Sequence, residues 1–197
     1  SGIWQNGGSF TGLSDATYSV QIRDAVTTSC VVVLGDQTIT EPVVLNLNVT
    51  KTDVLCNGES SGTISVTPFG GSLPYTYEWS DGPITTQNRV ALSSGPYTVT
   101  VTSAAGCIAT ATVSLSQPLA LVANGVDTPV NCTVNGAIAI TMSGGTTPYS
   151  YDWADVPGSS NGEDRDNLTP GTYDLTITDV NGCTDTYSTI LAEPVGC

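Results

Sequence analysis

The chain lacks histidine and has very few basic residues. Its 197 residues include four Lys and Arg against 18 Asp and Glu, which gives a formal net charge of −14. Binding to nucleic acid or to an anionic membrane surface depends on clustered Lys and Arg, so neither is an expected partner. Without histidine, a Ser–His or Cys–His nucleophile cannot form, and a zinc site has few ligands to use. The composition therefore argues against an enzyme.

Long apolar runs are also missing. No stretch approaches the roughly 18 apolar residues of a membrane span, so we expect no membrane insertion. By contrast, β-branched residues are frequent and accompany eight Tyr and three Trp, a mixture that favours strands. The 21 Gly and 11 Pro indicate many tight turns. Since no window shows the 3.6-residue apolar period of a helix, the sequence predicts an all-β fold.

One stretch occurs three times, at residues 16–30, 95–107 and 171–183. In the third copy Tyr173, Leu175 and Ile177 alternate with polar residues, and side chains two apart share one face of a strand. Other residues recur with the same period of about 76 residues: Pro42, Pro118 and Pro194; Cys56 and Cys132; Trp4, Trp79 and Trp153. A period of that length suits a small sandwich domain.

The period divides the chain into four parts. Residues 1–42 hold only the second half of a repeat (the N-terminal half-repeat), 43–118 are repeat one, 119–194 are repeat two, and 195–197 begin another. We interpret the chain as a segment cut from a longer array. The alternative is a filament subunit whose N-terminal half-repeat is completed by strand exchange with a neighbouring chain.

Each complete repeat is predicted to form about seven short strands. In repeat one they are expected at 43–49, 63–67, 74–79 and 87–91, followed by the hairpin 95–107. The Leu-x-x-Gly-x-Tyr sequence that opens the hairpin resembles the tyrosine corner of immunoglobulin-like sandwiches. The expected fold is therefore a linear array of tandem immunoglobulin-like antiparallel β-sandwich domains. We expect the Tyr of each hairpin and the Trp of each repeat to have structural roles: Tyr18, Tyr97, Tyr173, Trp4, Trp79 and Trp153.

Together the motifs of the repeats resemble the SprB repeat of Bacteroidota gliding-motility adhesins. In repeat one they are C-N-G at 56–58, G-G at 70–71, P-Y-T-Y-E-W-S-D-G at 74–82 and the hairpin 95–107. Repeat two has G-G at 144–145, P-Y-S-Y-D-W at 148–153 and the hairpin 171–183, but C-T-V at 132–134 and Ala154 in place of the Ser.

The resemblance implies a large extracellular protein on the cell surface of a Gram-negative bacterium, exported by type IX secretion, whose repeats form an adhesive filament used in gliding or attachment. We accordingly expect mechanical spacers whose partners are the neighbouring repeats and a surface or glycan ligand. The short connections after Pro42, Pro118 and Pro194 would limit bending. The alternative is a PKD-like spacer or a carbohydrate-binding module attached to a secreted hydrolase.

The six cysteines predict disulfides formed in an oxidising compartment. Cys56 precedes Cys107 by the same interval that separates Cys132 from Cys183, which favours one staple per repeat, Cys56–Cys107 and Cys132–Cys183. Six free thiols are the alternative. The pairing requires a bent first strand, because the two positions can lie at opposite ends of a sandwich. Cys30 would bond a residue upstream of Ser1, and Cys197 has no assigned partner.

Two further groups have alternative interpretations. Glu163, Asp164 and Asp166 form the best candidate calcium loop, although its spacing departs from the usual D-x-[DN]-x-[DN]-G pattern. A solvated loop without any cofactor is the favoured interpretation. The second group is an aromatic stripe in each repeat, which is either core or a sugar-stacking platform, with core favoured: Tyr75, Tyr77 and Trp79; Tyr149, Tyr151 and Trp153.

Overall fold

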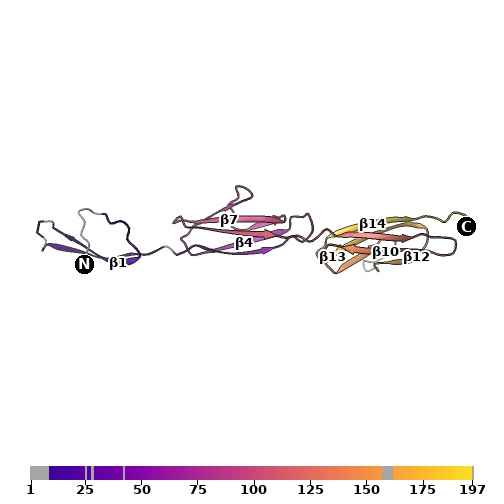
Figure 1. Cartoon of the computed structure of the whole chain (residues 1–197), viewed down its shortest axis with the longest axis horizontal. Helices are drawn as coiled ribbons and strands as arrows, with labels where there is room; N and C mark the ends of the chain where they lie inside the picture. The colour runs from indigo at the N-terminus through magenta and orange to yellow at the C-terminus, as the bar shows by residue number, and fades with distance from the viewer. Residues whose placement is uncertain (1–8, 25, 28, 42, 157–161, 197) are drawn as a thin grey trace.

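The computed structural model describes residues 9–196 except 25, 28, 42 and 157–161, so Trp4 and Cys197 lie outside the described residues. Figure 1 shows three bodies in a row along the long axis: the hairpin of the half-repeat, repeat one and repeat two. The described part of the chain contains no helix that is long and apolar enough to cross a membrane.

Repeat one contains six strands in two antiparallel sheets. One sheet has the order β3-β4-β6 and the other the order β5-β7-β8. The strands are β3 (Asn46–Thr52), β4 (Gly62–Phe69), β5 (Tyr75–Trp79), β6 (Arg89–Leu92), β7 (Gly95–Ser103) and β8 (Ile108–Leu115).

Repeat two has the same two sheets, β9-β10-β12 and β11-β13-β14. Its strands are β9 (Val122–Thr128), β10 (Gly136–Ser143), β11 (Tyr149–Trp153), β12 (Arg165–Leu168), β13 (Gly171–Asp179) and β14 (Thr184–Leu191). These pairings correspond to strands A-B-E and C-F-G of an immunoglobulin-like sandwich, and the described residues of the two repeats form no strand D. The predicted all-β fold of tandem sandwiches is confirmed, with six strands among the described residues of each repeat rather than about seven.

The core of each repeat follows from strand alternation. Val99 and Val101 of β7 lie on one face and meet Ile64 and Val66 of β4, and all four are at most 1% exposed. These positions face each other across the two sheets, as the immunoglobulin cysteines do, but here they are aliphatic. Trp79 completes this core, and Trp153 fills the equivalent place in repeat two with 0% exposure.

The tyrosine corner is present in all three copies. The hydroxyl of Tyr97 donates to the carbonyl of Ser93 at 3.0 Å, and that of Tyr173 donates to Thr169 at 2.8 Å. In the half-repeat, Tyr18 donates to Ser14 at 3.0 Å. This bond fixes the entry into strand β7 or β13 and explains why a Tyr begins each copy of the hairpin.

The half-repeat contains an antiparallel pair, β1 (Ala16–Arg23) and β2 (Val31–Ile39), with a bulge between Val20 and Gln21. No second sheet covers it within the described residues, and the paired apolar side chains of Ile22 and Val32 are 56% and 61% exposed. The corresponding face of β7–β8 is covered in repeat one. A second sheet at this face would complete the sandwich.

Candidate functional site: the joint between repeats

The joint between repeats one and two is formed by the exit end of one sandwich and the entry end of the next. We define the joint as residues 53–61 and 114–121 together with the turns at 144–146 and 179–183. Most recurrent motifs that do not pack in a core meet here: C-N-G of repeat one, and G-G and the hairpin turn of repeat two. The joint is therefore the part of the structure where the repeat motifs act together.

The exit end of repeat one holds the last strand and the start of the linker. The carboxylate of Asp53 accepts a hydrogen bond from the backbone N–H of Ser116 at 2.8 Å, and Lys51 Nζ donates to Asp53 at 2.8 Å and to the Ser114 carbonyl at 2.6 Å. The backbone N–H of Val54 donates to the Ser116 carbonyl at 3.0 Å. The Lys51 hydrogen bond, together with the Ser116 N–H, lowers the pKa of Asp53 to about 2.

The C-N-G motif binds the linker directly. Asn57 Nδ2 donates to the carbonyl of Pro118 at 2.9 Å, and the backbone N–H of Gly58 donates to Gln117 Oε1 at 2.9 Å. Gly58 has φ of +76°, a conformation that glycine adopts at low cost. Asn and Gly are thus used here to orient the next repeat, whereas repeat two has Thr133 and Val134 at the corresponding positions.

The entry end of repeat two contacts the next two residues of the linker, Leu119 and Ala120. The backbone N–H of Gly145 donates to the Leu119 carbonyl at 2.9 Å. A Cβ at Gly144 would lie 1.8 Å from the carbonyl oxygen of Ala120, so this close approach requires glycine. The same contact recurs where Val43 and Val44 enter repeat one, at Gly70 and Gly71. The G-G motif is therefore a docking site for the incoming chain.

A buried carboxylate organises the hairpin turn of repeat two. Asp179 is 5% exposed and accepts three backbone N–H bonds, from Thr146 at 2.8 Å and from Asn181 and Cys183 at 2.9 Å. Asn181 Nδ2 also reaches across to the Leu55 carbonyl of repeat one at 3.4 Å. The turn that carries Cys183 is thereby held against the C-N-G loop.

A disulfide closes the joint and corrects the predicted pairing. Cys56 of repeat one is bonded to Cys183 of repeat two, with a sequence separation of 127 and a Cα–Cα distance of 5.6 Å. The predicted pairs Cys56–Cys107 and Cys132–Cys183 are therefore wrong. Cys107 is free and half-buried, Cys30 is free and exposed, and Cys132 is also disulfide-bonded.

The physical reason is the length of the sandwich. Cys56 follows the exit end of β3, whereas Cys107 lies in the turn after β7, whose Ala104 N–H bonds Ser72 at the entry end. The nine residues of β7 separate these ends by about 30 Å, and a disulfide needs Cα atoms within ~7 Å. A bond across the joint needs no bent strand.

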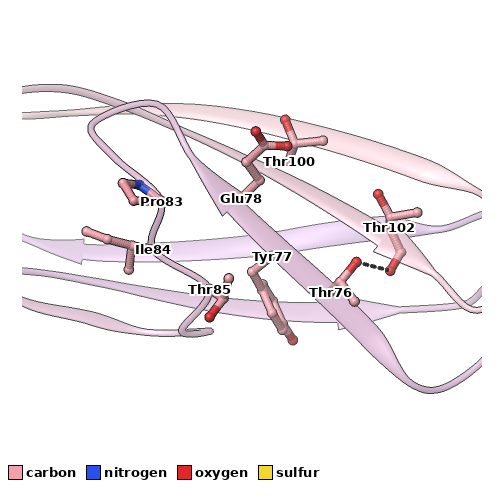
Figure 2. A pocket seen from close by; sticks show the side chains of 8 residues that line it. All are labelled: Thr76, Tyr77, Glu78, Pro83, Ile84, Thr85, Thr100 and Thr102. Atoms are coloured by element: carbon pink, nitrogen blue, oxygen red, sulfur yellow. Dashed lines mark hydrogen bonds between the residues drawn. The ribbon is translucent and has the colours of Figure 1, made fainter.

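The aromatic stripe lies mostly in the core. Trp79 is 3% exposed, and Tyr75 and Tyr77 are half-buried against the same cluster. Tyr77 and Glu78 line an open recess of about 350 Å³ together with threonines from β5 and β7 and the 83–85 loop. Figure 2 shows the side chains that line it. Burial raises the pKa of Tyr77. The Trp face needed for sugar stacking is therefore inside the protein.

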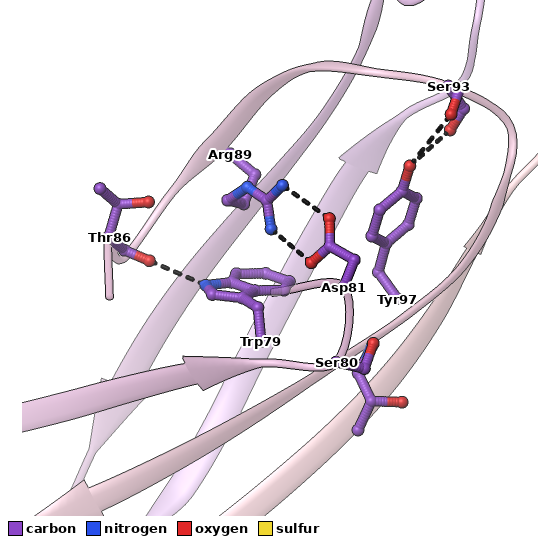
Figure 3. Close-up of polar contacts among 8 residues, drawn as sticks. Trp79, Ser80, Asp81, Thr86, Arg89, Ser93 and Tyr97 are labelled. Atoms are coloured by element: carbon purple, nitrogen blue, oxygen red, sulfur yellow. Dashed lines mark hydrogen bonds and ion pairs between the residues drawn. The ribbon is translucent and has the colours of Figure 1, made fainter. Parts of the chain in front are cut away.

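Two of the chain's three arginines have a structural role that the sequence did not reveal. Figure 3 shows Arg89 paired through both terminal nitrogens with Asp81 at 2.8 Å, and its guanidinium carbon lies 5.2 Å from the centroid of the Trp79 ring. Trp79 Nε1 donates to the Thr86 carbonyl at 2.9 Å. The Arg89 bonds lower the pKa of Asp81.

Repeat two reproduces this cluster. Arg165 pairs with Asp155 at 2.9 and 3.0 Å and lies 5.3 Å from the Trp153 ring. The recurrence of a rare residue, Arg89 and Arg165, at the repeat period was the signal that could have identified it. Because the guanidinium covers the indole face, this cluster seals the edge of each sandwich beside its short strand, β6 or β12.

The candidate calcium residues have separate contacts. Asp164 Oδ1 accepts a hydrogen bond from the backbone N–H of Ile140 at 2.8 Å, the same role that Asn88 has with Val66 in repeat one. Burial, together with the negative charge of Glu163, raises the pKa of Tyr151 to about 12. Asp166 is exposed. Among the described residues no group of three or more acidic, Cys or His side chains could hold a metal ion.

The strand order, tyrosine corners and repeated joint contacts define tandem immunoglobulin-like β-sandwich repeats. The family model of the SprB repeat matches residues 48–83 and 124–158, so each complete repeat carries an SprB repeat and the resemblance seen in the sequence is confirmed there. Each matched segment contains most of the first strand of its sandwich, the second and third strands, and the loop of Cys56 or Cys132. The comparison with curated proteins gave no match.

Solved structures with low identity are also similar to the chain. The N-terminal eight Ig domains of Down Syndrome Cell Adhesion Molecule match at 14% identity over 80% of this chain and 26% of that chain, with a TM-score of 0.42. The amphioxus IgVJ-C2 molecule matches at 14% identity over 78% of this chain and 99% of that chain, with a TM-score of 0.31. A C-terminal 282-residue fragment of intimin, in complex with the Tir intimin-binding domain, matches at 18% identity over 79% of this chain and 65% of that chain, with a TM-score of 0.41. The chain thus spans about a quarter of the first of these structures.

Proposed function

We propose that this chain is a non-enzymatic, rod-like spacer segment of a bacterial cell-surface adhesin or filament. The observation that carries the proposal is the joint: each linker residue from Ser116 to Leu119 has a hydrogen bond to one of the two sandwiches. A linker engaged in this way limits bending between repeats, which a reach-extending spacer requires.

The SprB repeats and the disulfide across the joint support this role at a cell surface. The finer expectation of a gliding adhesin exported by type IX secretion in a Bacteroidota species rests on the family resemblance alone. The expected partners are the neighbouring repeats, with a surface or glycan ligand bound elsewhere along the filament. No cofactor is required for a mechanical role.

Small-angle scattering and electron microscopy of the oxidised chain test the proposal. The two sandwiches should form a rod with one dominant interdomain angle. The variant Asn57→Ala with Gln117→Ala removes two linker bonds and should widen the angle distribution, whereas Asn124→Ala, on β9 outside the joint, should not. A flexible pair of domains in the unaltered chain would refute the stiff-spacer role.

The carbohydrate-binding alternative rests on the recess lined by Tyr77 and Glu78. Glycan-array binding that is lost in Glu78→Ala while the melting temperature is kept would favour it. The strand-exchange alternative rests on the uncovered face of β1–β2. If the native source protein has a denatured mass far above the 20.2 kDa of this chain, a longer array is indicated instead.

A further inference from the structure

The Cys56–Cys183 disulfide joins the first strand of repeat one to the last strand of repeat two. Cys56 closely follows β3, and Cys183 immediately precedes β14. Strand β3 runs from the entry end of its sandwich to the exit end, because Asn46 pairs with Phe69 beside the G-G turn and Thr52 pairs with Thr63 at the other end. Strand β14 likewise runs from the hairpin turn to the exit end of repeat two.

We propose that β3, the disulfide and β14 form a covalent load path that carries tension through both repeats. The path enters at Val43, crosses at Cys56–Cys183 and leaves at Glu193. Residues 57–182, which include all the other strands of the two sandwiches, lie on a side branch. This inference deepens the proposed spacer function, since a load path matters in a filament under tension.

Relative lengths decide which branch bears the force. Between Val43 and Glu193 the path through the disulfide contains about 25 residues, or roughly 90 Å when extended at ~3.5 Å per residue. The other branch spans a sequence separation of 127, or about 440 Å when extended. Tension straightens the shorter connection first, so the longer branch stays slack even if its hydrogen bonds open.

The folded structure already holds the short path nearly straight. Both β3 and β14 are strands, which rise about 3.3 Å per residue, close to the limit of an extended chain. The path therefore has little length to gain under force. Tension cannot lengthen the chain by drawing β3 out of repeat one or β14 out of repeat two, because the disulfide joins β3 and β14 covalently.

Force–extension measurement on single molecules tests this path, with handles at the two termini of the whole chain. Because Cys132 has its own disulfide, every variant carries Cys132→Ser. The oxidised reference should show no release of the segment between Cys56 and Cys183. Adding a dithiol reductant, or the double change Cys56→Ser and Cys183→Ser, should add about 440 Å of contour length.

Cys107→Ser is the matched control, since Cys107 is a free, half-buried thiol at the position equivalent to Cys183. It should leave the oxidised extension unchanged. If the oxidised reference releases as much length as the Cys56→Ser, Cys183→Ser variant, the load path is refuted. If the load path is refuted but scattering shows a rod, the spacer function stands. If the oxidised chain does not release the ~440 Å but scattering shows a flexible chain, the spacer function alone is refuted.

Discussion

The three tyrosine corners allow one hydrogen bond to be measured at two degrees of burial. Tyr97 and Tyr173 are 8% and 7% exposed, and each donates its hydroxyl proton to a carbonyl four residues earlier. Tyr18 makes the same bond in the half-repeat, on a sheet without a covering layer. Replacing each Tyr by Phe removes the hydroxyl and keeps the ring.

The expected loss can be worked out from the acceptors. Ser93 and Thr169 are exposed, so water can reach their carbonyls after the substitution and no buried acceptor is orphaned. The cost should then be the net value of one hydrogen bond, about 1 kcal/mol. For a domain of this size that corresponds to a fall of roughly 4–8 °C in the melting temperature.

Urea unfolding of the oxidised chain, followed by tryptophan fluorescence, measures the effect. Tyr97→Phe should lower the transition midpoint of repeat one, and Tyr173→Phe that of repeat two, at constant m-value. Tyr18→Phe should leave both midpoints unchanged. A loss below ~0.3 kcal/mol in both core variants would show that the corner bond does not stabilise the sandwich.

The remaining predictions concern the joint and the acidic loop. Gly144→Ala places a Cβ 1.8 Å from the Ala120 carbonyl and should destabilise repeat two by ~3 kcal/mol or more, whereas Gly182→Ala, with φ of +87° and no atom nearby, should cost only ~1–2 kcal/mol in thermal unfolding. An NMR titration should find the pKa of Asp53 near 2 and, in Lys51→Met, closer to its ordinary value of 3.8. Because the folded pKa is the lower one, this carboxylate's stabilising effect is complete above pH 3.8 and is lost as the pH falls towards 2. A calcium chelator should leave the melting temperature unchanged, and a fall would revive the calcium loop.

The sequence predicted the elements that obey the strand period. Val99 and Val101 alternate with threonines, and the structure buries both, because alternation directly encodes which face meets the core. The disulfide could not be predicted in the same way. The interval from Cys56 to Cys107 and the interval one period longer, the observed separation of 127, recur equally in a periodic chain. Spacing therefore cannot distinguish a bond within a repeat from one across a joint.

The Arg89 cluster was missed for a different reason. Its three members, Trp79, Asp81 and Arg89, come from a strand end, a turn and a short strand, so no single alternation pattern contains them. They meet only in the folded sandwich, where the turn after β5 brings Asp81 to Arg89 on β6. Comparing the two repeats with each other reveals this cluster, because Arg89 and Arg165 recur one period apart, whereas comparing neighbouring residues does not.

The equal length of the two repeats has a geometric consequence. Repeat two has a shorter loop after Cys132 and a correspondingly longer connection after Trp153, yet β3 and β9, and β8 and β14, remain one full period apart. If the joints of a longer array share one geometry, units of equal length repeat the same rotation and translation at every step, which generates a screw axis. Any outward face of a repeat would then return at a constant rise and angle along the rod, so a longer array would display one surface in a regular helical pattern.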